Sequence, residues 1–182
     1  MATSIALLRA INVGGNRSIK MADLAEVFGA AGCGNVRTYI QSGNVVFETG
    51  AVDRAELAER LEKVLGKTFG FTPAVILRDV AEMRGVVARN PFDGREDVAP
   101  NRLLVTFLKS DPGEAARVAV RAIPTGPEEV FIDGSELFIY YPDGAGTTKL
   151  PVAKIDRAHG QVGTSRNWNS VLKLVAMAEA RG

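Results

Sequence analysis

The order in which apolar runs and amphipathic stretches follow one another constrains the fold of this chain more than any other feature. An apolar run at residues 5–8 fits a buried strand, and residues 24–31 then keep helical spacing. Two β-branched or aromatic runs flank the turn Gln41–Asn44, a capped helix opens at Asp53, and another apolar run covers residues 74–77. This β-α-β-β-α-β order predicts a split βαβ, or ferredoxin-like, subdomain of the α+β class.

The second half of the chain repeats this order only in part. Residues 103–108 predict a strand, and Asp111 opens a capped helix. The runs 129–132 and 137–141 then predict a hairpin. Beyond them the pattern favours helices, which places Arg166 in the first turn of the last helix, against the helix dipole. Because no pattern indicates an eighth strand, we expect a second ferredoxin-like subdomain that is incomplete or irregular.

A polar, proline-containing stretch at residues 95–101 separates the two halves. We therefore expect an N-terminal ferredoxin-like subdomain with a linking helix over residues 1–94. A C-terminal α+β subdomain that ends in a helix is expected over residues 95–182. A chain of 182 residues is long enough to form one domain, or two small subdomains around a shared core.

Composition excludes several classes of protein. The single cysteine, Cys33, rules out an internal disulfide framework and is typical of a reducing compartment. One histidine and one cysteine cannot form a usual zinc site, and we expect no metal and no cofactor. No apolar run approaches the roughly 20 residues of a membrane span, and the N-terminus lacks the basic region of a signal peptide. We therefore expect a cytoplasmic protein with no membrane partner.

The net charge of +1 hides an uneven distribution. Residues 1–22 carry 3 cations and no acid, and residues 145–182 carry 6 cations and 2 acids. The middle of the chain, residues 23–144, carries 13 cations and 19 acids. If the two ends meet in space, they form a local positive site on a nearly neutral protein. Alternatively, the charges are scattered over two surfaces and have no common role.

Both positive ends contain a polar, asparagine-rich segment, and a third such segment surrounds a predicted turn. These segments are residues 9–16, 39–44 and 164–170. Asn and Gln amides can hold a ligand through paired hydrogen bonds, and a glycine pair between a strand and a helix suits a phosphate. Both patterns also suit simple turns. The predicted ligand-binding residues are Arg9, Asn12, Gly14, Gly15, Lys20, Gln41, Ser42, Asn44, Lys149, Arg166, Asn167 and Asn169.

Three strings carry a resemblance to a known family, namely Leu7–Gly15, Arg37–Phe47 and Thr164–Val171. With smaller similarities between them, they cover nearly the whole chain in the family's order. The chain thus resembles the bacterial family known as domain of unknown function 1697. The resemblance implies two ferredoxin-like α+β subdomains, and it brings no known activity, cofactor or catalytic residue. The family usually has glycine where this chain has Ala10, a change that costs little unless the backbone there takes a positive φ.

Three hypotheses about function follow from these patterns. The first is a polar site between the subdomains that binds a small anionic or nucleotide-like ligand. The alternative is an RNA- or single-strand-binding module, with Tyr39 and Phe47 as stacking residues on the sheet. In the third, the polar segments form an internal hydrogen-bonding network, held in part by Asn12 and Asn167, and bind no ligand.

Whether the protein is an enzyme stays open at the level of sequence. Tyr141, Lys149 and Arg166 suit acid–base or phosphate chemistry, but no spacing among them requires a reaction. Trp168 begins the apolar stripe of the last helix, and we expect it in the core. Catalytic residues, the identity of the ligand and the oligomeric state are therefore left unassigned.

Overall fold

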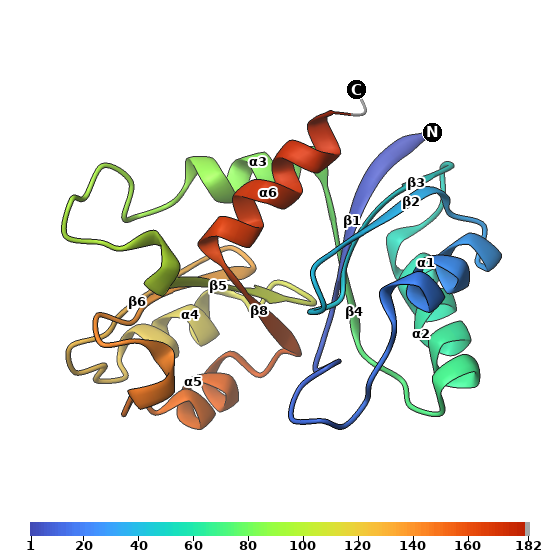
Figure 1. Cartoon of the computed structure of the whole chain (residues 1–182). Helices are drawn as coiled ribbons and strands as arrows, with labels where there is room; N and C mark the ends of the chain where they lie inside the picture. Colours follow the sequence, from blue (N-terminus) through green and yellow to red (C-terminus); the bar gives the residue numbers. More distant parts are fainter. Residues whose placement is uncertain (181–182) are drawn as a thin grey trace. The chain divides into compact units, whose positions relative to one another are not determined.

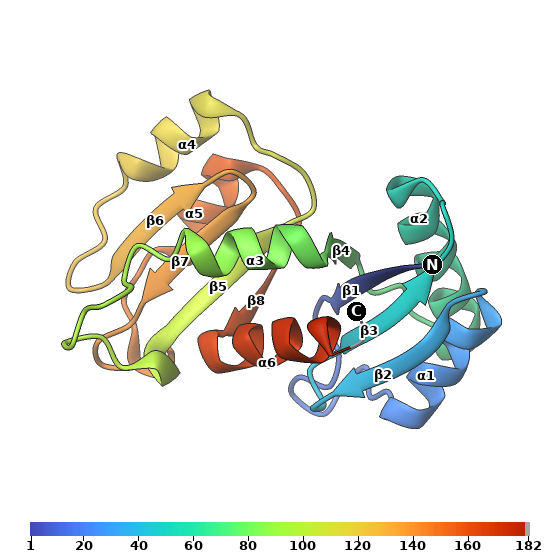
Figure 2. The same cartoon turned by 90° about the horizontal axis from the view of Figure 1, so that it is seen from above.

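The computed structural model describes residues 1–180, and the chain forms two compact units (Figures 1 and 2). Unit 1 contains Met1–Arg84 and the end of the chain from Lys173, and unit 2 contains Gly85–Leu172. Each unit is built on one four-stranded antiparallel sheet. The chain therefore consists of two units that each have their own sheet, and unit 1 is formed by two segments of the chain.

The chain passes from one unit to the other within two helices. The helix α3 (Val80–Ala88) leads from unit 1 into unit 2, and α6 (Trp168–Glu179) leads back. The expected division after residue 94 stays a prediction. The last of the six C-terminal cations, Arg181, lies outside the described residues.

Unit 1 has the element order expected from the sequence. Its sheet has the strand order β2-β3-β1-β4, and every neighbouring pair is antiparallel. This is the arrangement of a split βαβ fold, so the predicted ferredoxin-like subdomain is confirmed. The elements are β1 (Ala2–Leu8), α1 (Met21–Ala30), β2 (Gly34–Tyr39), β3 (Asn44–Thr49), α2 (Arg54–Phe69) and β4 (Val75–Asp79).

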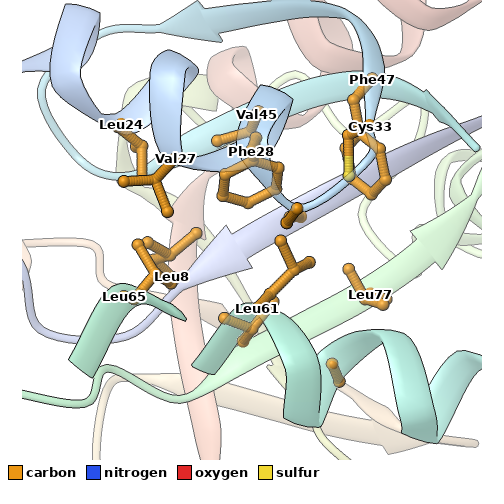
Figure 3. Close-up of a cluster of buried hydrophobic side chains, with 14 of the residues drawn as sticks. Leu8, Leu24, Val27, Phe28, Cys33, Val45, Phe47, Leu61, Leu65 and Leu77 are labelled. Atoms are coloured by element: carbon orange, nitrogen blue, oxygen red, sulfur yellow. The ribbon is translucent and has the colours of Figure 1, made fainter. Parts of the chain in front are cut away.

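The core of unit 1 forms where α1 and α2 cover one face of this sheet. Because side chains alternate between the two faces of a strand, Ala6 and Leu8 of β1 both point into this core. Figure 3 shows Leu8 with Phe28 of α1 and Leu61 of α2 around one apolar space. Phe28 also meets Phe47 of β3 edge to face, with the ring centroids 5.3 Å apart. Burial of each such large side chain contributes about 1.5–3 kcal/mol to the free energy of unfolding. The packed core therefore holds in place the ends of the strands from which the loops of unit 1 leave.

Helices α2 and α3 each begin directly after a capping aspartate. At the start of α2, Asp53 Oδ1 accepts hydrogen bonds from the N–H groups of Ala55 (2.9 Å) and Glu56 (3.1 Å). At the start of α3, Asp79 Oδ1 accepts from Glu82 N–H, and Glu82 Oε2 accepts from Asp79 N–H, both at 2.8 Å. This reciprocal pair is a capping box. The carboxylates of Asp53, Asp79 and Glu82 thus accept hydrogen bonds from backbone N–H groups at the starts of the two helices.

Unit 2 repeats the same fold in full, with the strand order β6-β7-β5-β8. The expectation of an incomplete or irregular second subdomain is wrong, because an eighth strand pairs antiparallel with β5. Two short 3-10 helices, η1 (Pro100–Arg102) and η2 (Ala145–Thr147), interrupt the connections. The other elements are β5 (Leu103–Leu108), α4 (Glu114–Arg121), β6 (Glu129–Asp133), β7 (Glu136–Tyr140), α5 (Val152–His159) and β8 (Gly163–Asn167).

The eighth strand is hard to detect in the sequence because it is polar and shows no apolar alternation. Thr164 and Arg166 face inward and are buried, whereas Ser165 is exposed and its Oγ lies 2.7 Å from Thr106 Oγ1 on β5. The strand forms because β5 supplies hydrogen-bonding partners along its edge. Arg166 is therefore a strand residue, and its expected place in the first turn of the last helix is wrong. That helix, α6, begins only at Trp168.

Candidate ligand-binding site

Two loops of unit 1 meet where β1 and β2 end. The connection from β1 to α1, residues 9–20, lies against the turn between β2 and β3, residues 40–43. Asn12 joins them, because its Nδ2 donates to Ile19 O (3.0 Å) and to Gln41 O (2.7 Å). Its Oδ1 also accepts from Ile19 N–H at 2.8 Å. Two of the three predicted polar segments thus come together, and we call residues 9–20 and 40–43 the loop cluster.

The turn side of the loop cluster is held by a buried amide and a glycine. Asn44 is fully buried, and its Nδ2 donates to Tyr39 O (3.0 Å) and Ser42 Oγ (2.9 Å). Gly43 takes a φ of 76°, and a Cβ at this position would lie 2.7 Å from Ile11 Cδ1. Only glycine suits both this backbone conformation and this close approach. Asn44 and Ser42 therefore shape the turn from within.

The loop cluster also holds an unusual share of strained backbone. Four non-glycine residues of the cluster take left-handed conformations, with φ values of 55° at Ala10, 54° at Asn12, 55° at Arg17 and 48° at Ile40. Asparagine tolerates this region, but alanine pays about 1–2 kcal/mol, and a β-branched isoleucine there is a genuine outlier. Ala10 thus takes the positive φ at which an alanine in place of glycine is costly. Strain of this kind concentrates at functional sites.

The glycine pair forms the tip of the long loop rather than a helix start. Gly14 and Gly15 take φ values of 64° and 75°, between the bridged residues Val13 and Asn16. Two successive positive φ angles are what a tight two-residue turn requires. Since α1 begins only at Met21, the glycines do not lie at its N-terminus. The turn accounts for both glycines without a bound phosphate.

Three cations on the loop cluster have no carboxylate partner among residues 1–180. Arg9 and Lys20 are exposed, and their side chains make no hydrogen bond or ion pair within that range. Arg17 is also exposed, and its guanidinium carbon lies 5.8 Å from the centre of the Phe71 ring. Within the described part of the chain Gln41 accepts a hydrogen bond through its backbone oxygen and makes none through its side chain, so its side-chain amide is available as well. The cluster therefore presents positive charge and amide groups to solvent.

The third polar segment belongs to unit 2, where its arginine is buried. Arg166 is 6% exposed, and its Nη1 donates to Thr164 Oγ1 (2.7 Å) and Ser165 O (2.8 Å). Burial lowers the pKa of Arg166 to about 10, because the charged form loses its hydration. The neighbouring hydroxyl and carbonyl groups partly replace that hydration. Arg166 is thus part of the interior of the strand.

The other predicted residues of unit 2 divide into structural and exposed groups. Asn167 Nδ2 donates to Asn101 O (2.9 Å), and its Oδ1 accepts from the N–H of Asn169 (3.0 Å) at the start of α6. Lys149 and the Asn169 side chain are exposed and make no side-chain hydrogen bond or ion pair with the described part of the chain. Trp168 is buried, as predicted. Asn167, like Asn12 and Asn44, is used internally.

Two aromatic side chains considered for other functions are buried. Phe47 is completely inaccessible in the core of unit 1, so it cannot stack on a base as the nucleic-acid hypothesis supposed. Tyr141 is buried in unit 2, and this burial, together with the charges of Glu128 and Asp156, raises the pKa of its hydroxyl. Tyr141 therefore stays protonated near neutral pH. Neither residue offers a reactive or stacking group to solvent.

The sequence patterns missed a group of arginine–carboxylate pairs in unit 2. Arg89 donates to Asp133 Oδ2 (2.8 Å) and to the buried Glu136 Oε2 (2.9 Å). Arg95 forms a two-pronged pair with Glu129, at 2.8 and 3.0 Å. Since these partners are 34–47 residues apart, no local spacing reveals them. They hold residues 89–95 against β6 and β7.

Residues 1–180 contain neither a cluster of metal-binding side chains nor a membrane-spanning helix. No group of three or more His, Cys, Asp or Glu side chains within that range is placed to hold a metal ion. None of its helices combines the length and the apolar character needed to cross a bilayer.

Comparison with known proteins identifies the fold and a family. Residues 1–138 match the model of a family described as "Protein of unknown function (DUF1697)". The solved structure of the conserved bacterial protein SP0830 from Streptococcus pneumoniae is similar, with a TM-score of 0.77 and 24% sequence identity. The match covers 98% of this chain and 99% of that chain, so the likeness extends over both units as a likeness of fold. No curated protein matches the chain.

Proposed function

Because this chain belongs to the DUF1697 family of proteins of unknown function, we propose from its own residues that the loop cluster of unit 1 binds a small anionic ligand. The observation that carries the proposal is the set of exposed cations, Arg9, Arg17 and Lys20, without a carboxylate partner among residues 1–180. A nearly neutral protein that leaves three cations unpaired on one pair of loops concentrates positive potential there.

The roles of the side chains in this site differ. The side-chain amide of Asn12 donates to the backbone oxygens of Ile19 and Gln41, and that of Asn44 donates to the backbone oxygen of Tyr39. These bonds hold the two loops in place. Arg9 and Lys20 are the residues we assign to the anion, because guanidinium and ammonium groups are the usual partners of phosphate and carboxylate. The free amide of Gln41 supplies a neutral hydrogen-bonding group beside them.

Exposed apolar side chains in the same loops favour a ligand with an apolar part. Val13 is 68% exposed and Ile40 is 50% exposed, next to residues that hydrogen bond to each other. Sites for small molecules commonly combine apolar walls with a few charged groups. A nucleotide-like molecule, with a phosphate and a flat ring, fits this combination.

A thermal-shift series with nucleotides, phosphorylated sugars and inorganic phosphate at about 1 mM tests the proposal. A ligand with a Kd of about 10 µM raises the unfolding free energy by about 2.7 kcal/mol at that concentration. The double variant Arg9→Ala with Lys20→Ala is expected to lose this stabilisation. Lys154→Ala, which removes an exposed cation from α5, is the matched control and keeps it.

Two results contradict the proposal. The first is that none of these anions stabilises the wild-type chain. The second is that the double variant and the control respond alike, which moves the ligand away from the loop cluster. Binding of single-stranded RNA with a steep salt dependence favours the nucleic-acid alternative instead.

A further inference from the structure

We propose that β6, the outer strand of the unit 2 sheet, binds an extended peptide segment of another protein by strand addition. This inference is independent of the ligand proposed for the loop cluster, because it concerns a different unit and a different kind of partner. In the strand order β6-β7-β5-β8, β6 has a neighbour on one side only among the strands of residues 1–180 (Figure 2). Its other side is a row of backbone groups that a further strand can pair with.

The register of the sheet shows which backbone groups face this free edge. Leu108 N–H donates to Ser135 O at 2.8 Å, so Ser135 turns its backbone groups toward β5. The direction alternates along an antiparallel strand, and Glu136 and Phe138 therefore turn toward β6. They pair with Asp133 and Phe131. Glu129, Phe131 and Asp133 of β6 therefore turn their backbone groups toward β7. The residues between them, Val130 and Ile132, turn their N–H and C=O groups to the opposite side, away from the sheet.

These outward groups are almost unused. Val130 N–H and C=O and Ile132 N–H make no hydrogen bond with any residue in the range 1–180. Ile132 O accepts one bond, from Arg121 Nη2, at 3.4 Å. That distance is longer than the usual N–H···O range, so an incoming backbone N–H can replace it. The edge thus offers two donors and two acceptors to a second strand.

A groove beside β6 provides room for side chains of the added strand. The depression has a volume of about 520 Å³ and is lined by Pro91, Phe131, Phe138 and Arg121 among others. Phe131 is 43% exposed, although its ring packs edge to face on Phe92 at 5.3 Å. Because alternate residues of an added strand point to the same face, an apolar residue opposite Phe131 covers the exposed part of this ring.

The charges around the groove indicate the partner's chemistry. Arg89 is already engaged by Asp133 and Glu136. The side chain of Arg121 is 50% exposed, with one carboxylate contact, to Glu114 at 2.9 Å. Once its contact with Ile132 O is replaced, this guanidinium faces the added strand. The complementary peptide therefore alternates apolar residues and carries an acidic residue beside Arg121.

A second copy of this chain fits the edge less well. In the symmetric pairing that uses both outward residues, Val130 lies opposite Ile132 of the other copy. That register places Glu129 opposite Asp133 twice, once on each side of the two-fold axis. Arg95 and Arg89 already pair with these carboxylates, but the symmetric register gives them no new cationic partner, and like charges directly opposite each other in a sheet are destabilising. The edge therefore favours a foreign strand whose acidic residue meets Arg121.

A random heptapeptide library selected on the full chain tests this proposal. We expect the enriched peptides to alternate apolar residues and to carry a glutamate or aspartate. Bound peptide should slow the hydrogen exchange of the Val130 and Ile132 amides and leave the Phe131 amide, already bonded to β7, unchanged. Absence of enriched peptides, or enrichment without this exchange pattern, overturns the proposal.

Two variants distinguish strand addition from non-specific peptide binding. Val130→Pro removes an outward N–H without touching the bonds to β7, as proline on an edge strand allows, and it should lower peptide affinity at least about tenfold. Val130→Thr, which keeps the N–H, is the matched control. Equal binding by both variants contradicts the proposal.

Charge reversal gives a test that does not depend on the proline variant folding. Arg121→Glu should weaken the selected acidic peptide about tenfold and strengthen the same peptide with lysine in place of its acid. Loss of binding to both peptides, or no change in either, argues against a strand beside Arg121. A concentration-dependent dimer of the wild-type chain that Val130→Pro abolishes shows that the occupant is a second copy, and overturns the proposal of a foreign strand.

Discussion

The two units have sheets of the same topology, but the loop that follows the first strand differs between them. In unit 1, Leu8 N–H donates to Gly43 O (2.9 Å) and Arg9 N–H to Ala74 O (2.9 Å). In unit 2, Leu108 N–H donates to Ser135 O (2.8 Å) and Lys109 N–H to Val162 O (2.8 Å). These bonds join the same three strands in each unit, so the two first strands end in equivalent places.

Beyond these equivalent bonds, the connections diverge. The first strand of unit 1 leads to its helix through residues 9–20, whereas that of unit 2 needs only residues 109–113. Among residues 1–180, all five non-glycine residues with left-handed φ lie in unit 1, and unit 2 uses glycine at every such position. The short connection shows what the fold requires. The longer, strained loop of unit 1 is an addition, which is why we assign the ligand to it.

The largest expected effect distinguishes the two hairpin turns. Gly43→Ala adds a Cβ against Ile11 and Leu8 and forces alanine into a left-handed conformation, so unfolding should become easier by about 3 kcal/mol. The control is Gly134→Ala in unit 2, where the new Cβ meets only the ends of two side chains, Arg89 at 3.3 Å and Glu136 at 3.9 Å. That change should cost about 1 kcal/mol. Urea unfolding measures both, and an equal loss removes the claim that the unit 1 turn is the more tightly built.

An intermediate effect is expected for the asparagines that hold the loops. Asn12→Ala removes three hydrogen bonds, two within residues 9–20 and one from that loop to Gln41 O, and it should destabilise the protein by about 2 kcal/mol. Asn167→Ala removes two bonds in unit 2 and should cost about 1 kcal/mol. Chemical denaturation of both variants gives the comparison. Unchanged stability in Asn12→Ala would mean that its amide serves a ligand rather than the loops.

The smallest effect has the opposite sign in the two units. Ala10→Gly relieves a left-handed alanine, and it should stabilise the protein by up to about 1 kcal/mol after the entropy of the unfolded chain is counted. Ala115→Gly, on the exposed side of α4, should destabilise by about 0.5–1 kcal/mol. Melting temperatures of the two variants should therefore move in opposite directions. A loss of stability in both would show that the left-handed backbone at residue 10 carries little strain.

The sequence indicated the elements of unit 1 well because their signals are local. The continuous apolar run of β1, the caps at Asp53 and Asp79, and the turn at Gly43 each act within a few residues. In unit 2 the same reasoning found β5, β6 and β7 and missed β8 (Gly163–Asn167). A strand of small polar residues depends on its neighbour, and the neighbour is more than fifty residues away in the chain.

The candidate site was foreseeable in part. The polar segments at residues 9–16 and 39–44 were recognised, but their composition did not show which amides point inward. Asn12 bonds Gln41, 29 residues away, and Asn167 bonds Asn101, 66 residues away. Such pairs follow no periodicity. Arg166 shows the same limit, since its burial comes from the pairing of β8 with β5.

The sequence by itself determined the α+β class, the order of the first six elements, and the caps of α2 and α3, because these depend on side chains and backbone within one or two turns of the chain. The cap expected at Asp111 is wrong, since Gly113 is the N-cap residue of α4. Only the tertiary structure decided that the second fold is complete, that the asparagines hold loops while Arg9 and Lys20 remain exposed, and that β6 keeps a free edge. These features depend on which strand lies beside which, and hydrogen bonds between distant residues carry no local pattern.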